Sequence, residues 1–152
     1  MGKIDDTDMK ILAELIKDAS LSVPKLSKKI NVNASVVYSR IKRLLKRRLV
    51  KRFTVDVNDE ILGYVVTAII GVNMDAKFRE SIIDELVRLN EVREVSEVTG
   101  RFDLLVVVRT RSLDELHDTV SGRIGRINGV SHTETFIEMK RKEREPHYSL
   151  PK

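Results

Sequence analysis

The chain has 152 residues, no cysteine and a formal net charge of +5. The lack of cysteine excludes disulfides, thiolate metal sites and cysteine nucleophiles. The sequence contains no apolar run long enough to span a membrane, and its N-terminus MGKIDDTDMK lacks the apolar core of a secretory signal, so we expect a cytoplasmic protein. The charge is uneven: residues 1–52 carry 14 Lys and Arg against 5 Asp and Glu, whereas residues 53–152 carry 14 against 18. This asymmetry predicts two domains with different partners.

Two helices are expected before residue 31. The stretch DDTDMKILAELIKDA has an acidic start, which favours a helix N-terminus, and an apolar stripe of Ile11, Leu12, Leu15 and Ile16. In LSVPKLSKKI, Ser22 is a candidate N-cap and Pro24 falls in the first turn. Asn31 to Asn33 then interrupt the pattern, which predicts the tight turn of a helix-turn-helix.

The third helix is expected from Asn33, its candidate N-cap, to Leu49. At about 100° per residue, the apolar side chains lie within about 80° of Ile41. The basic side chains occupy the opposite arc together with Ser35, Val36 and Ser39. The helix is therefore predicted to have one apolar face and one strongly basic face.

Eight Lys and Arg lie between residues 40 and 52, and no acidic residue occurs from 19 to 55. A merely solvated helix face usually mixes in Glu, which pairs with Lys or Arg one turn away. The density of like charge favours a polyanion, specifically double-stranded DNA, as the partner of this face.

The segment LVKRFTVDVND, residues 49–59, alternates like a strand and begins with Lys51 and Arg52. This position after the third helix is typical of the wing of a winged helix-turn-helix. We place the DNA-binding domain at 1–52, a wing or linker strand at 53–62, a second domain at 63–140 and a polar tail at 141–152.

The second domain alternates strand and helix patterns in the order βαββαβ, which is the ferredoxin-like arrangement. The overall fold class is therefore α+β: an N-terminal winged helix-turn-helix joined to a C-terminal ferredoxin-like domain. The first and third strands, around 65–70 and 104–108, are almost continuously apolar. Because the two helices of this motif cover only one sheet face, continuous apolarity predicts that a second copy of the chain covers the other.

A basic helix-turn-helix followed by βαββαβ resembles the Lrp/AsnC family of transcription regulators. The likeness covers essentially the whole chain and is carried by IDDTDMKILAELIKDA, LSKKINVNASVVYSRIKRLLKRRLVKRFTVDVN, VTGRFDLLVVVRT and INGVSHTETFIEM. The resemblance implies a nucleoid-associated, sequence-specific regulator. Its C-terminal domain would dimerise, assemble into larger rings such as an octamer, and bind a free amino acid between dimers.

The resemblance also assigns candidate sites. The DNA-binding residues would lie on the second and third helices and at the start of the wing: Lys25, Asn33, Ser35, Val36, Ser39, Arg40, Lys42, Arg43, Lys46, Arg47, Lys51 and Arg52. Of these, Ser35, Val36, Ser39 and Arg40 would reach base edges, Arg40 by forking onto guanine, and the more distal cations would meet phosphates. The effector residues would be Thr99, Gly100, Arg101, Phe102, Asp103, Thr133 and Thr135.

Two departures from the family pattern stand in the first domain. The recognition helix opens with NAS where members often have a proline-containing entry, which would change the preferred bases. Arg48 stands where many members carry glycine, which would add a phosphate contact or strain the turn.

The alternatives are an architectural DNA-binding protein with little sequence preference and an enzyme related to the siroheme decarboxylases. The three histidines, His117, His132 and His147, lie far apart and show no metal-binding spacing, so no catalytic or metal site and no cofactor are expected. From the residues alone, TGRFD is also compatible with a simple hairpin turn in which Gly100 supplies a positive φ.

Overall fold

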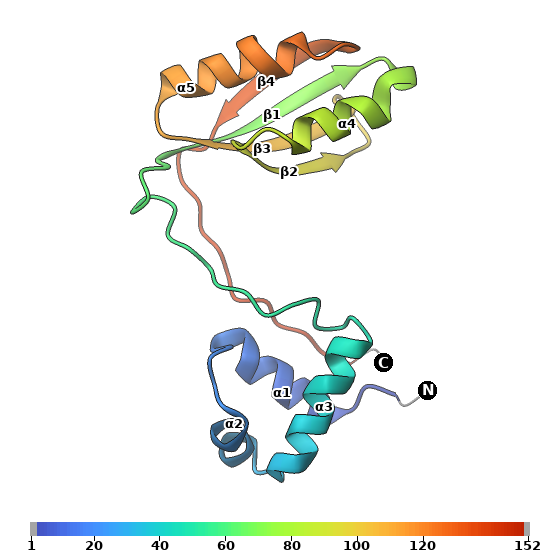
Figure 1. The fold of residues 1–152 in the computed structure, drawn as a ribbon, viewed down its shortest axis with the longest axis vertical. Coiled ribbons are helices and arrows are strands. Elements are labelled where there is room, and N and C mark those ends of the chain that lie inside the picture. Colours follow the sequence, from blue (N-terminus) through green and yellow to red (C-terminus); the bar gives the residue numbers. More distant parts are fainter. Residues whose placement is uncertain (1–2, 151–152) are drawn as a thin grey trace. The chain divides into compact units, whose positions relative to one another are not determined.

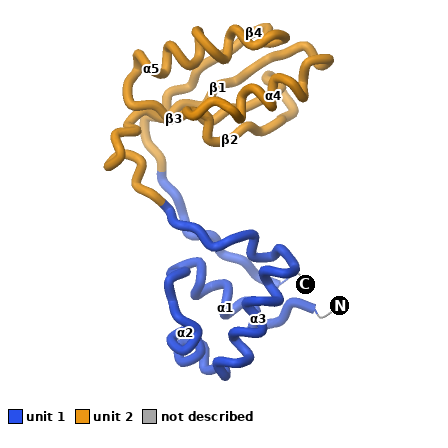
Figure 2. The backbone as a smooth tube through the Cα atoms, viewed as in Figure 1, with its two compact units in different colours: residues 1–56, 142–152 blue, residues 57–141 orange. Residues whose placement is uncertain are grey.

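The computed structural model describes residues 3–150. The chain divides into two compact units, one formed by residues 3–56 with 142–150 and the other by residues 57–141 (Figure 2). The polar tail predicted as a separate segment therefore groups with the N-terminal helices.

The first unit contains α1 (Asp6–Lys17), α2 (Val23–Ile30) and α3 (Ala34–Lys46). Its core consists of one or two apolar side chains from each helix, all at most 9% exposed: Ile11, Leu15, Leu26, Val37 and Leu44. Asn33 caps α3 as predicted, because its side chain accepts the backbone N–H of Ser35 at 2.9 Å. Ser22 precedes α2 but makes no capping hydrogen bond with its side chain.

Two residues with positive φ end the second and third helices. Asn31, at φ 54°, ends α2, and an asparagine tolerates this left-handed conformation better than most residues. Arg48, at φ 56°, follows α3 in a Schellman motif, in which the N–H of Leu49 bonds the carbonyl of Leu44 at 3.0 Å. The turn therefore requires a left-handed backbone at Arg48, the conformation that a glycine would adopt without strain.

The strand predicted for the wing is wrong. Residues 51–58 join no β ladder and have irregular structure. Three apolar side chains at alternate positions of this segment stay exposed, namely Phe53, Val55 and Val57 at 46%, 79% and 49%. The alternation is present, but a strand needs a hydrogen-bonded neighbour, and a single copy of the chain supplies none here.

The second unit has the predicted βαββαβ order (Figure 1). Its strands are β1 (Val66–Met74), β2 (Val92–Glu97), β3 (Leu104–Thr110) and β4 (Val130–Ile137), and its main helices are α4 (Arg79–Val87) and α5 (Leu113–His117). The sheet order is β2-β3-β1-β4 and every pairing is antiparallel. The two almost continuously apolar strands, β1 and β3, are the central ones.

The second helix of the βαββαβ order, α5, is short and is followed by irregular helical turns. After α5 the chain forms a π-helical turn, η2 (Asp118–Arg123), and a short 3-10 turn, η3 (Ile124–Arg126). Gly122 and Gly125 lie in these turns, and glycine is a poor α-helix former.

Both helices lie on one face of the sheet (Figure 1). On β3, burial alternates: Leu104, Val106 and Val108 are fully buried beneath the helices, whereas Leu105 and Val107 on the other face are only partly covered. Val106 therefore belongs to the helix-covered core, not to the open face. The open face carries the side chains that a second copy would have to cover.

Candidate nucleic-acid interface

The first turns of α3 present short side chains to solvent. Ser35, Val36 and Ser39 are all exposed, and Val36 keeps 39% of its surface. The Ser35 hydroxyl bonds the Asn33 side chain at 2.8 Å, and the Ser39 hydroxyl donates to the Val36 carbonyl at 2.9 Å. Short side chains allow the helix backbone to approach base edges in a major groove, which is about 12 Å wide.

Further along α3 and beyond it, exposed cations form the remainder of this surface. Lys42, Lys46, Lys51 and Arg52 are exposed, and none of them pairs with a carboxylate within residues 3–150. The Lys42 ammonium lies 4.7 Å from the centre of the Tyr38 ring. Arg47 at the end of α3 and Lys25 on α2 are also exposed.

Arg40 and Arg43 lie elsewhere than predicted. Their guanidinium groups turn toward α1, where Arg40 bonds Asp5 at 2.5 Å and Asp8 at 3.3 Å, and Arg43 bonds Asp8. The Asp8 side chain is fully buried, and the two arginine side chains are only 24% and 32% exposed. The predicted basic face of α3 thus has two of its charges taken up by ion pairs with Asp5 and Asp8.

This arrangement corrects the sequence argument based on missing acidic residues. No carboxylate lies near the basic run along the chain, but the start of α1 brings Asp5 and Asp8 to it from 32 to 35 residues upstream. Asp5 and Asp8 also form a reciprocal capping box at the start of α1, each accepting the other's backbone N–H at 3.1 Å. The backbone hydrogen bond from Asp8 and the Arg40 guanidinium hold the pKa of Asp5 below its usual value.

The predicted effector segment connects β2 to β3 and is more than a hairpin turn. Asp103 accepts the backbone N–H of Met74 at 2.9 Å, and Arg101 forms an ion pair with Glu134 on β4 at 2.6 Å. The Phe102 ring lies over Gly71 of β1, so closely that a Cβ on Gly71 would come within 2.6 Å of the ring. The segment is thereby fixed to β1 and β4 across the open face.

Phe102 also makes an edge-on contact with Phe136 of β4, with ring centres 6.1 Å apart. Gly100 has φ 132°, as expected if it supplies the positive φ of this loop. The open face therefore carries a local aromatic cluster next to the predicted effector loop.

Thr133 and Thr135 are not brought to this loop. They pair with Val72 and Ile70 of β1 and so share the helix-covered face of the sheet, whereas Glu134 and Phe136 share the open face with Phe102. Thr135 instead lines a cavity of about 340 Å³ beside α5. A strand's alternation places neighbouring residues on opposite faces, and the face assignment depends on a register that the sequence does not reveal.

Within residues 3–150, no helix is both long and apolar enough to cross a membrane. In the same part of the chain, no three His, Asp or Glu side chains converge so that they could hold a metal ion.

A helix-turn-helix unit with an exposed, basic third helix, followed by a separate four-stranded α+β unit, defines a two-domain transcription regulator. Sequence models agree: that of the AsnC-type helix-turn-helix domain matches residues 4–45, and that of the Lrp/AsnC ligand binding domain matches residues 67–147. The chain belongs to the Lrp/AsnC family of transcription regulators.

Individual relatives cover nearly the whole chain. This chain is 37% identical over 139 residues to the HTH-type transcriptional regulator FL11 of Pyrococcus furiosus, with 91% of each chain covered. AsnC of E. coli superimposes with a TM-score of 0.88 at 28% identity, covering 95% of this chain and 100% of that one. The transcriptional regulator NMB0573 of Neisseria meningitidis, solved as a complex with L-Met, has the same fold, with a TM-score of 0.91 at 21% identity and 97% of each chain covered.

Proposed function

We propose that this protein is a sequence-specific DNA-binding regulator whose C-terminal unit dimerises and binds a free amino acid as its effector. The observation that carries the DNA-binding part is the exposed face of α3, with short side chains in its first turns and unpaired lysines further along. This is the arrangement that a recognition helix needs, with base contacts near its N-terminus and phosphate contacts beyond them.

Base reading is assigned to Ser35, Val36 and Ser39. Hydroxyls bond either donors or acceptors on base edges, and the exposed Val36 suits the methyl group of thymine. Arg40 is assigned a different role from the guanine contact expected from sequence, because its guanidinium is occupied by Asp5 and Asp8. It positions α3 against α1 and reaches no base while those bonds persist.

Phosphate contacts are assigned to Lys25, Lys42, Lys46, Arg47, Lys51 and Arg52. Cations of this kind supply sequence-independent affinity and make binding strongly dependent on salt. If a dimer neutralises about 6–10 phosphates, affinity falls about 10³–10⁵-fold between 50 and 200 mM salt.

Dimerisation is assigned to the open face of the sheet. Leu105, Val107 and Phe136 lie on this face, and Phe136 keeps 45% of its surface exposed. A partly apolar sheet face without a covering layer is stabilised when a second copy packs on it. Larger rings, such as an octamer, would be built from these dimers.

The effector is proposed to be an amino acid held by the loop from Thr99 to Asp103. Backbone N–H groups near Gly100 suit its carboxylate, and the Asp103 carboxylate suits its ammonium group. Because Thr133 and Thr135 lie on the other sheet face, they would contribute only from another copy in the assembly. The match of residues 67–147 to the ligand binding domain of the family supports this proposal.

The proposal is tested by fluorescence anisotropy on the DNA upstream of the protein's own gene and on a scrambled duplex of equal length, at about 150 mM salt. A sequence-specific regulator prefers the first by about 10³-fold or more. Repeating the titration with a mixture of the twenty amino acids tests the effector. Further promoter fragments are compared with their scrambled counterparts in the same way. Equal affinity for each fragment and its scrambled counterpart would refute sequence specificity and support the architectural alternative.

A further inference from the structure

The first helix has a second apolar stripe that the DNA-binding role does not use. Met9, Leu12, Ala13 and Ile16 recur at the spacing of a single helix face. They line a cavity, whereas the core of the unit takes Ile11 and Leu15. Ile16 keeps 36% of its surface exposed, so this stripe is incompletely covered.

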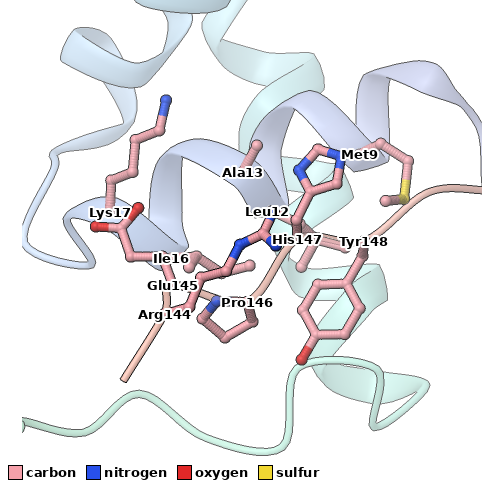
Figure 3. A pocket seen from close by; sticks show the side chains of 10 residues that line it. All are labelled: Met9, Leu12, Ala13, Ile16, Lys17, Arg144, Glu145, Pro146, His147 and Tyr148. Atoms are coloured by element: carbon pink, nitrogen blue, oxygen red, sulfur yellow. The ribbon is translucent and has the colours of Figure 1, made fainter. Parts of the chain in front are cut away.

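The C-terminal tail lies over that stripe. Residues Arg144 to Tyr148 form the opposite wall of the cavity, which has a volume of about 570 Å³ (Figure 3). His147 lies next to Leu12 and Met9 and Pro146 lies near Ile16, whereas the Tyr148 ring points away from α1 (Figure 3). The segment predicted from the sequence to be a separate polar tail is therefore grouped with the helix-turn-helix unit.

We propose that the outer stripe of α1 is a docking surface for the chain's own residues 144–148, and that this docking is reversible. The cavity shows that tail and helix do not pack closely, and Tyr148 remains 62% exposed. Limited burial makes the contact weak, so its occupancy depends on the high effective concentration that a short covalent tether provides. A change that moves the tether is then enough to release the tail.

Docking changes how far apart the two units can move. From the end of β4 at Ile137 to Arg144 the chain spans at most about 25 Å when fully extended. The other linker runs from Val50, which packs on the helical core, to Asp59, which pairs with Arg109, and spans at most about 32 Å. A docked tail is thus the shorter of two connections between the ligand-binding unit and the helix-turn-helix. When the tail is released, only the longer connection limits the separation of the two units.

This difference assigns the tail a role in selecting DNA. With the tail docked, the helix-turn-helix units of an assembly are confined, and only DNA with half-sites at a matching spacing is bound well. With the tail released, a wider range of spacings is tolerated. This consequence depends on the proposed DNA-binding function, whereas the docking itself does not.

Docking is tested on the full-length protein without DNA. Because the chain has no cysteine, Met9→Cys with His147→Cys creates a single pair for a short bismaleimide cross-linker. The matched control is Lys25→Cys with His147→Cys, which uses an exposed position on α2 away from the cavity. Docking predicts a cross-link within one chain that forms several-fold faster than in the control, seen on a denaturing gel as a monomer of altered mobility.

Three results would overturn the proposal. A covalent dimer would show that the stripe holds the tail of another copy, and a rate equal to the control would show that the tail is not docked. Adding Ile16→Lys to the Met9→Cys and His147→Cys pair should slow the reaction, whereas Ala19→Lys, which adds the same charge outside this cavity, should not. Equal rates for these two variants would also overturn the docking.

The regulatory consequence has its own measurement. Ile16→Lys should bind a series of duplexes with different half-site spacings more evenly than the Ala19→Lys variant does. If the unmodified protein binds no DNA, the proposed function is refuted, but the cross-linking result is unaffected. Cross-linking as predicted with an unchanged spacing preference would overturn only the role of the tail in selecting DNA.

Discussion

Replacing Asp8 by asparagine tests the ion-pair cluster that joins α1 to α3. The asparagine keeps the size of the side chain and an oxygen that can accept the backbone N–H of Asp5, so the change removes mainly the negative charge. Arg43 then loses its carboxylate partner, and Arg40 keeps only Asp5. The variant therefore has two partly buried guanidinium groups but only one carboxylate, Asp5, which pairs with Arg40.

The size of the effect follows from burial. Removing one partner of a buried ion pair costs about 3–5 kcal/mol. Here the arginine side chains retain 24% and 32% exposure, so water compensates in part and we expect about 2–3 kcal/mol. For a unit of this size, that lowers the midpoint of thermal unfolding by about 10–20 °C.

The assay is thermal unfolding followed by far-UV circular dichroism, with hydrogen exchange of the α1 amides to assign the transition to the helical unit. Asp6→Asn is the matched control, since Asp6 is exposed in the same helical turn and forms no ion pair within the described residues. Equal midpoints for the two variants would refute the reasoning. A double-mutant cycle with Arg43→Met should show a coupling of about 1 kcal/mol or more.

Three further predictions concern other parts of the molecule. Arg48→Gly should raise the free energy of unfolding of the helical unit by about 0.5–1 kcal/mol, measured as a higher urea midpoint. A left-handed arginine costs about 1–2 kcal/mol, and the extra chain entropy of glycine in the unfolded state offsets part of the gain. A lower midpoint would contradict the left-handed backbone at Arg48. Leu105→Glu should leave the secondary structure intact and yield a monomer by light scattering, and a stable dimer from this variant would exclude the open face as the interface. The pKa of Asp5 is lowered in the folded state from an ordinary value of 3.8, so its stabilisation is complete above that pH and is lost as the pH falls below it. Asp5→Asn should therefore reduce the steepness of acid unfolding below about pH 4, measured by circular dichroism, and an unchanged acid profile would show that this carboxyl does not contribute.

Local patterns in the sequence were sufficient to predict most of the fold. The capping side chain of Asn33 and the apolar spacing around Ile41 define α3, and the apolar composition of residues 104–108 indicates a central strand. These features depend on neighbours within a few residues, so they can be read along the chain. The predicted strand at 49–59 failed because a strand also needs a partner that the local sequence does not provide.

The site was predicted less completely, for reasons of distance and register. The exposed positions of Ser35, Val36 and Ser39 follow from helical periodicity alone. The pairing of Arg40 with Asp8 joins residues 32 positions apart, and no local pattern indicates it. The one available signal for this pairing was Asp8, an acidic residue one turn before Ile11 on the buried side of α1.

The side of the sheet on which a residue lies was the other information that the sequence lacked. Continuous apolarity in the third strand hid the alternation between Val106, beneath the helices, and Leu105, on the open face. For the last strand, Thr133 and Thr135 are separated from the loop at Gly100 by the sheet itself. Each assignment to a face required the pairing register, because a shift of one residue in that register would move every side chain to the opposite face.

In the proposed function, the exposed basic face of α3 binds DNA phosphates, while Arg40 holds the helix in place. The most direct measurement is the slope of log affinity against log salt concentration for the unmodified protein, Lys46→Ala and Arg40→Met. We expect a slope reduced by about one for each Lys46 in contact with DNA. For Arg40→Met we expect an unchanged slope under conditions where this variant remains folded. An unchanged slope for Lys46→Ala together with a reduced one for Arg40→Met would contradict the account, because it would place Arg40 on the DNA and Lys46 away from it.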